Sequence, residues 1–270
     1  MSVSERTAGE LVLNNVSKTY APRRFGDAPV HAVEGVSLRV KPGGALGLVG
    51  ESGSGKTTLA RLITGVERPT AGAIEFEGVR VDGLGRRALR EYRAHVQMVF
   101  QDPYAALNPL HTVRYTLERP LRNYLRLSGR ETRTHVHRLL ETVGLVPVEQ
   151  FEAKLPHQLS GGQLQRTVIA RALASRPRLI VADEPVSMLD VSLRAGILQL
   201  LDELRTQMGM SLLYITHDLL SARVATEEVL VLHRGRVVEH GRTIDVLRRP
   251  QHAYTKALVA AVPSPFERAA

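Results

Sequence analysis

The chain has 270 residues, a net charge of +9 and no cysteine. The length allows one large domain or a core with an inserted subdomain, and the lack of cysteine excludes disulfides, thiolate chemistry and zinc–sulfur sites. No apolar run approaches the roughly 20 residues that cross a bilayer, and the polar first ten residues lack the apolar stretch of a signal peptide, so we expect a protein kept in the cytosol.

Arginine carries most of the positive charge, because only five of the 36 basic residues are lysine. A basic balance is compatible with nucleic acid, with an anionic membrane surface or with a solvated surface. The arginines are scattered, no nucleic-acid-reading motif accompanies them, and aromatic residues are too few for stacking platforms. We therefore favour a solvated surface and expect no nucleic-acid partner, and we leave proximity to an acidic lipid surface open.

The first hundred residues alternate between strand and helix patterns. Strands are expected at residues 11–13, 36–40, 45–49, 73–76 and 96–100. Residues 21–29, rich in proline, arginine and glycine, indicate a loop between the first two. The run at 45–49 is apolar and bounded by glycines, which suits a buried parallel strand, and residues 56–64 predict a helix with one apolar face.

The middle of the chain is helical. Helices are expected at residues 113–127, 130–143 and 163–174, within an all-helical insert over about residues 102–175. Strand signals return at residues 179–182 and 212–215, with an apolar-striped helix between them. This alternation predicts an α/β fold, with a mostly parallel sheet covered by helices.

Residues 50–57 fit the phosphate-binding pattern G-x-x-x-x-G-K-[ST] at every required position. The glycines let the backbone wrap the phosphates, Lys56 reaches the outer phosphates, and Thr57 is expected to ligate Mg²⁺. The position after a strand and before a helix argues against a chance match. The expected ATP-binding residues of this loop are Gly50, Glu51, Ser52, Gly53, Ser54, Gly55, Lys56, Thr57 and Thr58.

Asp183 and Glu184 follow the apolar strand at 179–182. A carboxylate at the end of a buried strand is placed to hold Mg²⁺, so Asp183 is a metal-ligand candidate. Glu184 is the candidate to position and deprotonate the attacking water. The alternative is an acidic helix cap after a core strand, but the presence of Lys56 upstream favours catalysis.

Three further side chains are candidates by their position. His217 follows a strand and is expected at the sheet edge where ligands bind in open α/β sheets, in contact with the γ-phosphate. Gln101 follows the strand at 96–100, so it is expected at the same edge of the sheet, where it could sense magnesium or the attacking water. Tyr20 precedes the phosphate loop and either stacks on adenine or is an edge-strand tyrosine with no ligand.

A second glycine-rich turn lies far downstream, at residues 159–163 (LSGGQ), and opens a helix. Its backbone N–H groups offer a site to a second anion. One nucleotide site needs only one phosphate loop, so the economical interpretation is that each copy of the chain completes the site of another copy or of a close relative.

Taken together, these segments resemble the ATP-binding cassette family, over about residues 11–262. The resemblance implies a P-loop NTPase (RecA-like) core with N-terminal antiparallel strands and an inserted α-helical subdomain. It also implies a head-to-tail dimer in which Ser160 and Gly162 of one subunit contact the γ-phosphate bound by the other, and in which Asp190 links the two sites. The whole turn, with Gly161 and Gln163, is counted among the expected nucleotide-binding residues. Residues 1–10 and 263–270 are expected to be tails.

A narrower resemblance is to the oligopeptide, dipeptide and nickel importers. Residues 100–109, residues 156–158 and the tail at 252–258 are similar to segments of that branch. Ala253 stands where a proline is usual, and the cysteine cluster of some members is missing, which rules out an iron–sulfur site.

The resemblance implies an ATPase subunit at the cytoplasmic face of the membrane that energises import of peptides or of nickel and other metal chelates. The implied partners are a second ATPase subunit (a paralogue or an identical chain), two integral membrane permease subunits and, indirectly, an extracytoplasmic solute-binding protein. The alternatives are a cassette ATPase that acts on nucleic acid or ribosomes, and an exporter subunit. A single cassette without a heptad run counts against the first, and exporters commonly carry fused membrane spans.

Overall fold

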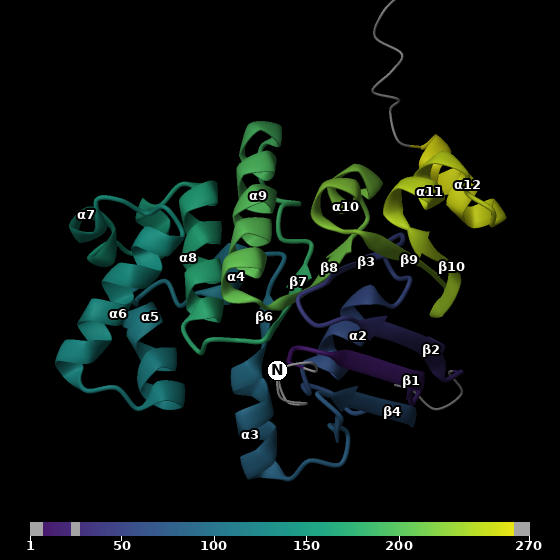
Figure 1. The fold of residues 1–270 in the computed structure, drawn as a ribbon, viewed down its shortest axis with the longest axis horizontal. Helices are drawn as coiled ribbons and strands as arrows, with labels where there is room; N and C mark the ends of the chain where they lie inside the picture. The colour runs from purple at the N-terminus through teal and green to yellow at the C-terminus, as the bar shows by residue number, and fades with distance from the viewer. Residues whose placement is uncertain (1–7, 23–27, 262–270) are drawn as a thin grey trace, which may run out of the picture. The chain divides into compact units, whose positions relative to one another are not determined.

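The computed structural model describes residues 8–22 and 28–261, which fall into two compact units. The first unit is drawn from Met1–Gly83 and Leu212–Ala270, and the second is Leu84–Ser211. Most of the predicted N-terminal tail and all of the predicted C-terminal tail lie outside the described residues. Figure 1 shows the elements of both units with their labels.

An antiparallel sheet of four strands forms part of the first unit. Its order is β2 (Val30–Val40), β1 (Leu11–Tyr20), β4 (Ala71–Phe76) and β5 (Val79–Arg80). Leu11, Leu13 and Val16 of β1 are buried, and Leu11 and Leu13 pair with β2 and β4 on either side. β1 and β2 are longer than the predicted segments because their solvent-facing residues dilute the apolar signal. β1 is an inner strand, so Tyr20 does not lie on an edge strand.

The remaining strands of the first unit are mostly parallel and buried. β3 (Ala45–Val49) pairs in parallel with β8 (Ser211–Thr216) on one side and β9 (Glu228–His233) on the other, and β10 (Arg236–Arg242) pairs antiparallel with β9. Every residue of β3 is buried, as its glycine-bounded apolar run predicted. α2 (Lys56–Ile63) follows β3 with Leu59, Leu62 and Ile63 buried, so the predicted helix is also confirmed.

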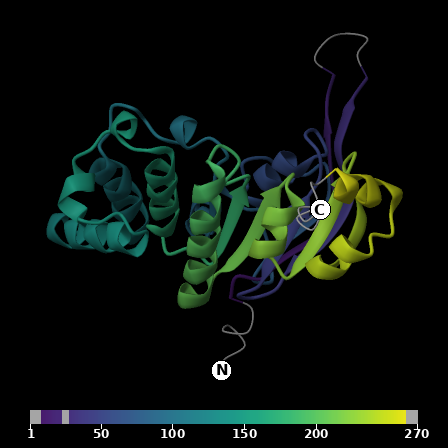
Figure 2. The same ribbon diagram turned by 90° about the horizontal axis from the view of Figure 1, so that it is seen from above.

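Three helices complete the first unit: α10 (Leu219–Ala225), α11 (Thr243–Arg248) and α12 (Ala253–Ala260). α10 packs on β3, whereas α11 and α12 both pack against β10. In Figure 2 the two last helices, in yellow, lie beside each other at the end of the coloured chain. The C-terminal helices are therefore part of the same compact unit as the loop that follows β3.

In the second unit two parallel strands carry the helices around them. β6 (Val96–Val99) pairs with β7 (Leu179–Asp183), and every residue of β7 is buried. α3 (Arg86–His95) leads into β6, α8 (Gly161–Leu173) packs on β6, and α9 (Val191–Met208) packs on α8. The α/β prediction is confirmed by these strands and helices.

Residues 102–175, all of which the structure describes, carry helices and no strand. Besides α8, this segment contains α4 (Pro103–Ala106), α5 (Val113–Pro120), α6 (Gly129–Thr142) and α7 (Val148–Glu152). The side chains of Asp102 and Thr112 accept N–H groups at the starts of α4 and α5, as N-caps do. α5 is shorter than the predicted helix 113–127, because after Pro120 the backbone continues as a π-helical turn, Leu121–Leu125.

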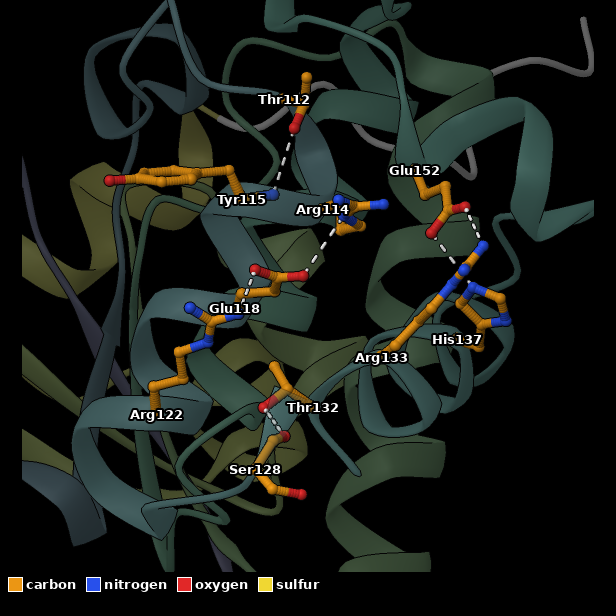
Figure 3. A network of polar contacts seen from close by, with 10 residues as sticks. All are labelled: Thr112, Arg114, Tyr115, Glu118, Arg122, Ser128, Thr132, Arg133, His137 and Glu152. Carbon is orange, nitrogen blue, oxygen red and sulfur yellow. Dashed lines mark hydrogen bonds and ion pairs between the residues drawn. The ribbon is translucent and has the colours of Figure 1, made fainter. Parts of the chain in front are cut away.

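Ion pairs lie both within and between the helices of this segment (Figure 3). On α5, Glu118 lies 3.3 Å from Arg114 and 3.1 Å from Arg122. On α7, Glu152 is only 8% exposed and pairs with His137 at 3.1 Å and Arg133 at 3.4 Å, both on α6. The Glu152 pairs therefore fix α7 against α6. Within the described ranges 8–22 and 28–261, the helices are too short or too polar to cross a membrane.

Candidate functional site

The phosphate loop connects β3 to α2, and two of its glycines cannot be replaced without a clash. A Cβ on Gly50 would lie 2.2 Å from the carbonyl oxygen of Leu232 and 2.7 Å from Oγ of Ser54. Gly55 precedes α2 at φ +108°, and its Cβ would lie 2.4 Å from the carbonyl oxygen of Ala32. The loop therefore needs glycine at both ends for close backbone packing.

Lys56 is 5% exposed, and its ammonium group points back into the loop. Nζ donates to the carbonyl oxygens of Gly50 at 2.6 Å and of Glu51 at 2.8 Å. Ser54 beside it is also 5% exposed, and its Oγ has no hydrogen-bond partner among the described residues. A buried hydroxyl without a partner is costly, so a loop that brings this group and a buried cation together fits an anionic ligand such as a phosphate.

Strand register brings His217 to the edge where the phosphate loop begins. Val49, the last residue of β3, pairs with Thr216 of β8 and with Val231 of β9. Gly50 and His217 therefore leave neighbouring strands at the same level, and His217 is exposed there. Contact of this imidazole with the γ-phosphate stays a prediction.

Tyr20 is fixed by the residues around it at the end of β1. Its hydroxyl donates to Oε2 of Glu67 at 2.7 Å, and Nζ of Lys18 lies 5.1 Å from its ring centroid and 3.3 Å from the same carboxylate. Burial, followed by the hydrogen bond to Glu67, raises the pKa of Tyr20, while the bonds from Tyr20 and Lys18 outweigh burial and lower the pKa of Glu67. Stacking of adenine on this ring stays a prediction.

The two candidate carboxylates, Asp183 and Glu184, lie at the end of β7 in the second unit. Asp183 is the last residue of β7 and is 5% exposed. Glu184 follows at φ +48°, in the left-handed region, which costs a non-glycine residue about 1–2 kcal/mol. Its carbonyl oxygen accepts from Ser187 Oγ at 3.0 Å, and its carboxylate Oε2 accepts from Gln101 Nε2 at 3.1 Å. Two residues singled out separately in the sequence are thus hydrogen-bonded partners.

The second glycine-rich turn forms the start of α8. Ser160 Oγ accepts from the N–H of Gln163 at 3.4 Å, and the Gln163 side chain accepts from the N–H of Ser160 at 3.1 Å, which is a reciprocal capping box. The hydroxyl of Ser160 accepts in this bond, so its own proton can be donated to an anion. A Cβ on Gly161 or Gly162 would lie 3.4 Å from the end of a leucine side chain, which is an ordinary van der Waals contact, so packing within this chain does not require glycine at the turn.

Asp190 begins α9, and its side chain makes no capping bond there. Its carbonyl oxygen accepts from the N–H groups of Leu193 at 2.9 Å and Arg194 at 3.2 Å. The carboxylate is exposed. The structure therefore leaves this side chain accessible to another molecule.

Magnesium prefers oxygen ligands, and three predicted ligands supply them. Thr57 is exposed in the first turn of α2 in the first unit, and Asp183 and Gln101 belong to the second unit. Each of these oxygens is of a type that suits a hard cation, and their joint role in holding Mg²⁺ stays a prediction.

Tyr254 contacts the phosphate loop, and sequence reasoning missed it. Its hydroxyl accepts from the N–H of Glu51 at 2.9 Å across 203 positions of sequence. The tail at 252–258 had been singled out by its resemblance alone. No local pattern predicts which loop a distant helix will contact. The one signal in the sequence was the segment at 252–258, which is similar to the importer branch although it stands far from the other site residues.

Comparisons with known proteins match most of the chain to ATP-binding proteins of transporters. A family model described as "ABC transporter" matches residues 33–187. The oligopeptide transport ATP-binding protein OppF of Lactococcus lactis is 42% identical over 252 residues, which cover 92% of this chain and 78% of that protein. OppF of Escherichia coli is 45% identical over 87% of this chain and 70% of its own length. The glutathione import ATP-binding protein GsiA of Shigella flexneri is 45% identical over 87% of this chain and 37% of its own length.

Solved structures of ATP-binding cassettes also match most of the chain. A dimeric, post-hydrolysis structure of the ATP-binding cassette MJ0796 with ADP and Pi bound has a TM-score of 0.77 and 35% identity, and covers 86% of this chain and 98% of its own. Clostridium perfringens CbiO1, described as part of an ABC transporter complex, has a TM-score of 0.77 and 28% identity over 88% of this chain and 90% of its own.

Proposed function

Since the chain belongs to the ABC transporter family and is an ATPase, we propose that it energises the uptake of peptides through partner membrane subunits. The predicted P-loop NTPase fold is confirmed by the likeness to the solved cassettes. The observation that carries the proposal is the match to OppF proteins over about nine-tenths of the chain, together with a phosphate loop that presents a buried Lys56. Peptide is favoured because GsiA is named for glutathione, itself a tripeptide.

The residues divide the hydrolytic reaction between them. The loop at residues 50–58 wraps the phosphates of ATP, and Lys56 exchanges its two carbonyl acceptors for phosphate oxygens. Glu184 accepts a proton from the attacking water, whose oxygen forms a bond to the γ-phosphorus as the bond to the ADP oxygen breaks. Gln101 positions the carboxylate of Glu184, and His217 contacts the γ-phosphate. Thr57, Asp183 and Gln101 would hold Mg²⁺, and the ion would supply neutralisation of the phosphate charge.

A second cassette completes the site. Ser160 and Gly162 of one subunit donate to the γ-phosphate held by the phosphate loop of the other, and Asp190 links the two sites. Because the γ-phosphate contacts both subunits, ATP favours the closed dimer, and hydrolysis removes that differential contact. The MJ0796 cassette is dimeric, which supports this arrangement. The second cassette is a paralogue or an identical chain.

The remaining partners are two integral membrane permease subunits, which place the cassette at the cytoplasmic face of the membrane, and indirectly an extracytoplasmic solute-binding protein. We propose one ATP-binding domain over residues 11–262, with a helical subdomain at about 102–175 that grips a permease near residues 101–109. Leu110 is 84% exposed and Tyr104 is 56% exposed beside that segment, which supports a protein partner there.

The test is purification of the tagged chain from detergent-solubilised membranes, followed by reconstitution with whatever co-purifies. Multi-span proteins are expected to accompany the chain, and vesicles containing them should accumulate a labelled peptide only when ATP is present. The same vesicles assayed with a nickel chelate separate the two cargo classes. Co-purification of ribosomes or DNA in place of multi-span proteins would overturn the transport assignment and favour the alternative class.

A further inference from the structure

The helix α12 near the end of the described chain contacts the phosphate loop through one side chain. Oη of Tyr254 accepts a hydrogen bond from the backbone N–H of Glu51 at 2.9 Å. We infer that Tyr254 is a positioning residue, which holds the start of the phosphate loop in the shape that receives the triphosphate. The inference rests on ATP binding by this loop and not on which molecule is transported.

Glu51 is the residue of the loop through which this hold reaches Lys56. Its carbonyl oxygen accepts from Nζ of Lys56 at 2.8 Å and from the N–H of Ser54 at 3.2 Å. Its N–H donates to Tyr254, so the backbone of Glu51 is bonded on both sides. When phosphate oxygens replace the carbonyl groups around Lys56, the bonds of Glu51 to Ser54 and to Tyr254 remain, and only the second ties this stretch to a distant segment of the chain.

The ring of Tyr254 is itself held in position. It lies against the imidazole of His233, with ring centroids 3.9 Å apart and planes inclined by 31°. His233 ends β9, and the residue before it, Leu232, presents the carbonyl oxygen against which Gly50 packs. Burial raises the pKa of Tyr254, so its hydroxyl keeps its proton and accepts through a lone pair. The same strand end therefore supports both the loop and the tyrosine that holds it.

The approach to α12 is anchored to β10 through Glu239. The two oxygens of its carboxylate accept from the N–H of Gln251 at 2.9 Å and of His252 at 3.0 Å. His252 Nδ1 in turn accepts from the N–H of Tyr254 at 3.2 Å and caps the helix. A continuous series of bonds thus runs from β10 through the helix start to the phosphate loop.

A purely structural role and a positioning role predict different results. If Tyr254 only packs α12 against the first unit, its hydroxyl is dispensable and the ring alone matters. If it positions the loop, the hydroxyl matters for nucleotide affinity. Tyr254→Phe separates the two, because it keeps the ring on His233 and removes only the acceptor for the Glu51 N–H.

The experiment measures the Kd of a fluorescent ATP analogue, and KM and kcat for ATP hydrolysis, in full-length protein. For Tyr254→Phe we expect Kd and KM to rise roughly two- to tenfold, the range of one ordinary hydrogen bond, and kcat at saturating ATP to change by less than about twofold. Tyr124→Phe, on the π-helical turn of the second unit, is the matched control and should leave Kd, KM and kcat at wild-type values.

A second variant guards against a folding defect in the first. His233→Ala removes the surface that supports the ring and leaves the hydroxyl, so it should raise Kd in the same direction. Wild-type Kd and KM in folded Tyr254→Phe protein would overturn the inference, as would a fall in kcat with KM unchanged. Failure of the transport proposal would appear separately, as absent peptide uptake by a protein with normal ATP affinity.

Discussion

The side-chain amide of Gln101 donates to the carboxylate of Glu184 across 3.1 Å, although 83 positions separate them. The two residues follow β6 and β7, which pair in parallel with Val99 opposite Ala182, so the strands end at nearly the same level. The glutamine therefore orients the carboxylate of the proposed base. The sequence made each of these residues a separate candidate because each follows a strand. The hydrogen bond joins the two side chains directly.

Replacement Glu184→Gln should leave ATP binding intact and lower turnover at least about 100-fold, because the amide cannot take the proton of the attacking water. Phosphate release under steady-state conditions gives the rate, and size-exclusion chromatography with ATP should show a dimer that persists. Glu149→Gln on α7 serves as the matched control and should hydrolyse ATP at the wild-type rate. Hydrolysis at that same rate by the Glu184 variant would remove this residue from its role.

Replacement Gln101→Ala should lower kcat roughly tenfold through loss of the hydrogen bond that orients Glu184. Nucleotide affinity measured without Mg²⁺ should change little, since the hydrogen bond that is lost is the one to the carboxylate of Glu184. A double-mutant comparison with Glu184→Gln is the decisive measurement, because residues that act as a unit show non-additive losses. Strictly additive effects of the two replacements would contradict the pairing.

Replacement Lys56→Ala should weaken ATP binding about 10- to 100-fold, the range of charged hydrogen bonds. Lys56 is buried with its ammonium group inside the loop, so the variant also leaves the carbonyl oxygens of Gly50 and Glu51 without this donor. Titration with a fluorescent ATP analogue gives the Kd. Lys41→Ala, which removes an exposed lysine paired with Glu228, should bind ATP as the wild type does.

Replacement Gly50→Ala should destabilise the protein by about 3 kcal/mol, because the new methyl group meets the backbone of β9 at 2.2 Å. The midpoint of urea unfolding and the Kd for ATP should both worsen. Gly209→Ala is the matched control: its φ is +62°, but nothing lies within 4 Å of the added Cβ. That variant should lose about 1 kcal/mol of stability and keep its ATP affinity; equal effects of both changes on ATP affinity would contradict the steric argument.

The stability of α12 should depend on pH through Glu239. Burial opposes the charged form of this carboxylate, but the hydroxyl of Thr255 on α12, followed by the N–H groups of Gln251 and His252, outweighs it and lowers its pKa from the ordinary value of 4.5. A lowered folded-state pKa contributes stability that is complete above the unfolded value and is lost as the pH falls through the folded value. The hydrogen-exchange protection factors of α12 amides, which are corrected for the intrinsic exchange rate, should therefore fall in acid below about pH 4.5, and Glu239→Gln should flatten that dependence. An unchanged dependence in the variant would argue against Glu239 as the anchor.

Much of the candidate site follows from local sequence. A glycine-bounded apolar run predicts β3, the motif after it predicts the loop and α2, and His217 and Asp183 lie at strand ends as the same reasoning requires. These inferences succeed because parallel strands are buried on both faces and their apolar runs stand out. The antiparallel strands β1 and β2 were underestimated, since most of their residues are exposed or only half-buried and their apolar signal is weaker.

Contacts between distant segments could not be predicted in the same way. The bond from Glu51 to Tyr254, the pair formed by Gln101 and Glu184, and the stacking of Tyr254 on His233 all depend on how elements pack. The break of the helix after Pro120 also depends on its surroundings, because a proline can be accommodated by a π-helical turn. Sequence therefore predicts the chemical groups better than the residues that hold them in place.

Alignment of β8 with β3 controls two properties of the first unit together. Val49 lies opposite Thr216, and Tyr214, two residues earlier on β8, is completely buried. Insertion of a single residue into β8 would move Thr216 to the level of His217 and would turn Tyr214 to the opposite face of the sheet. The position of His217 at the sheet edge and the packing of Tyr214 in the interior therefore change together. Insertions and deletions that the protein tolerates should fall in the loops and not in β8.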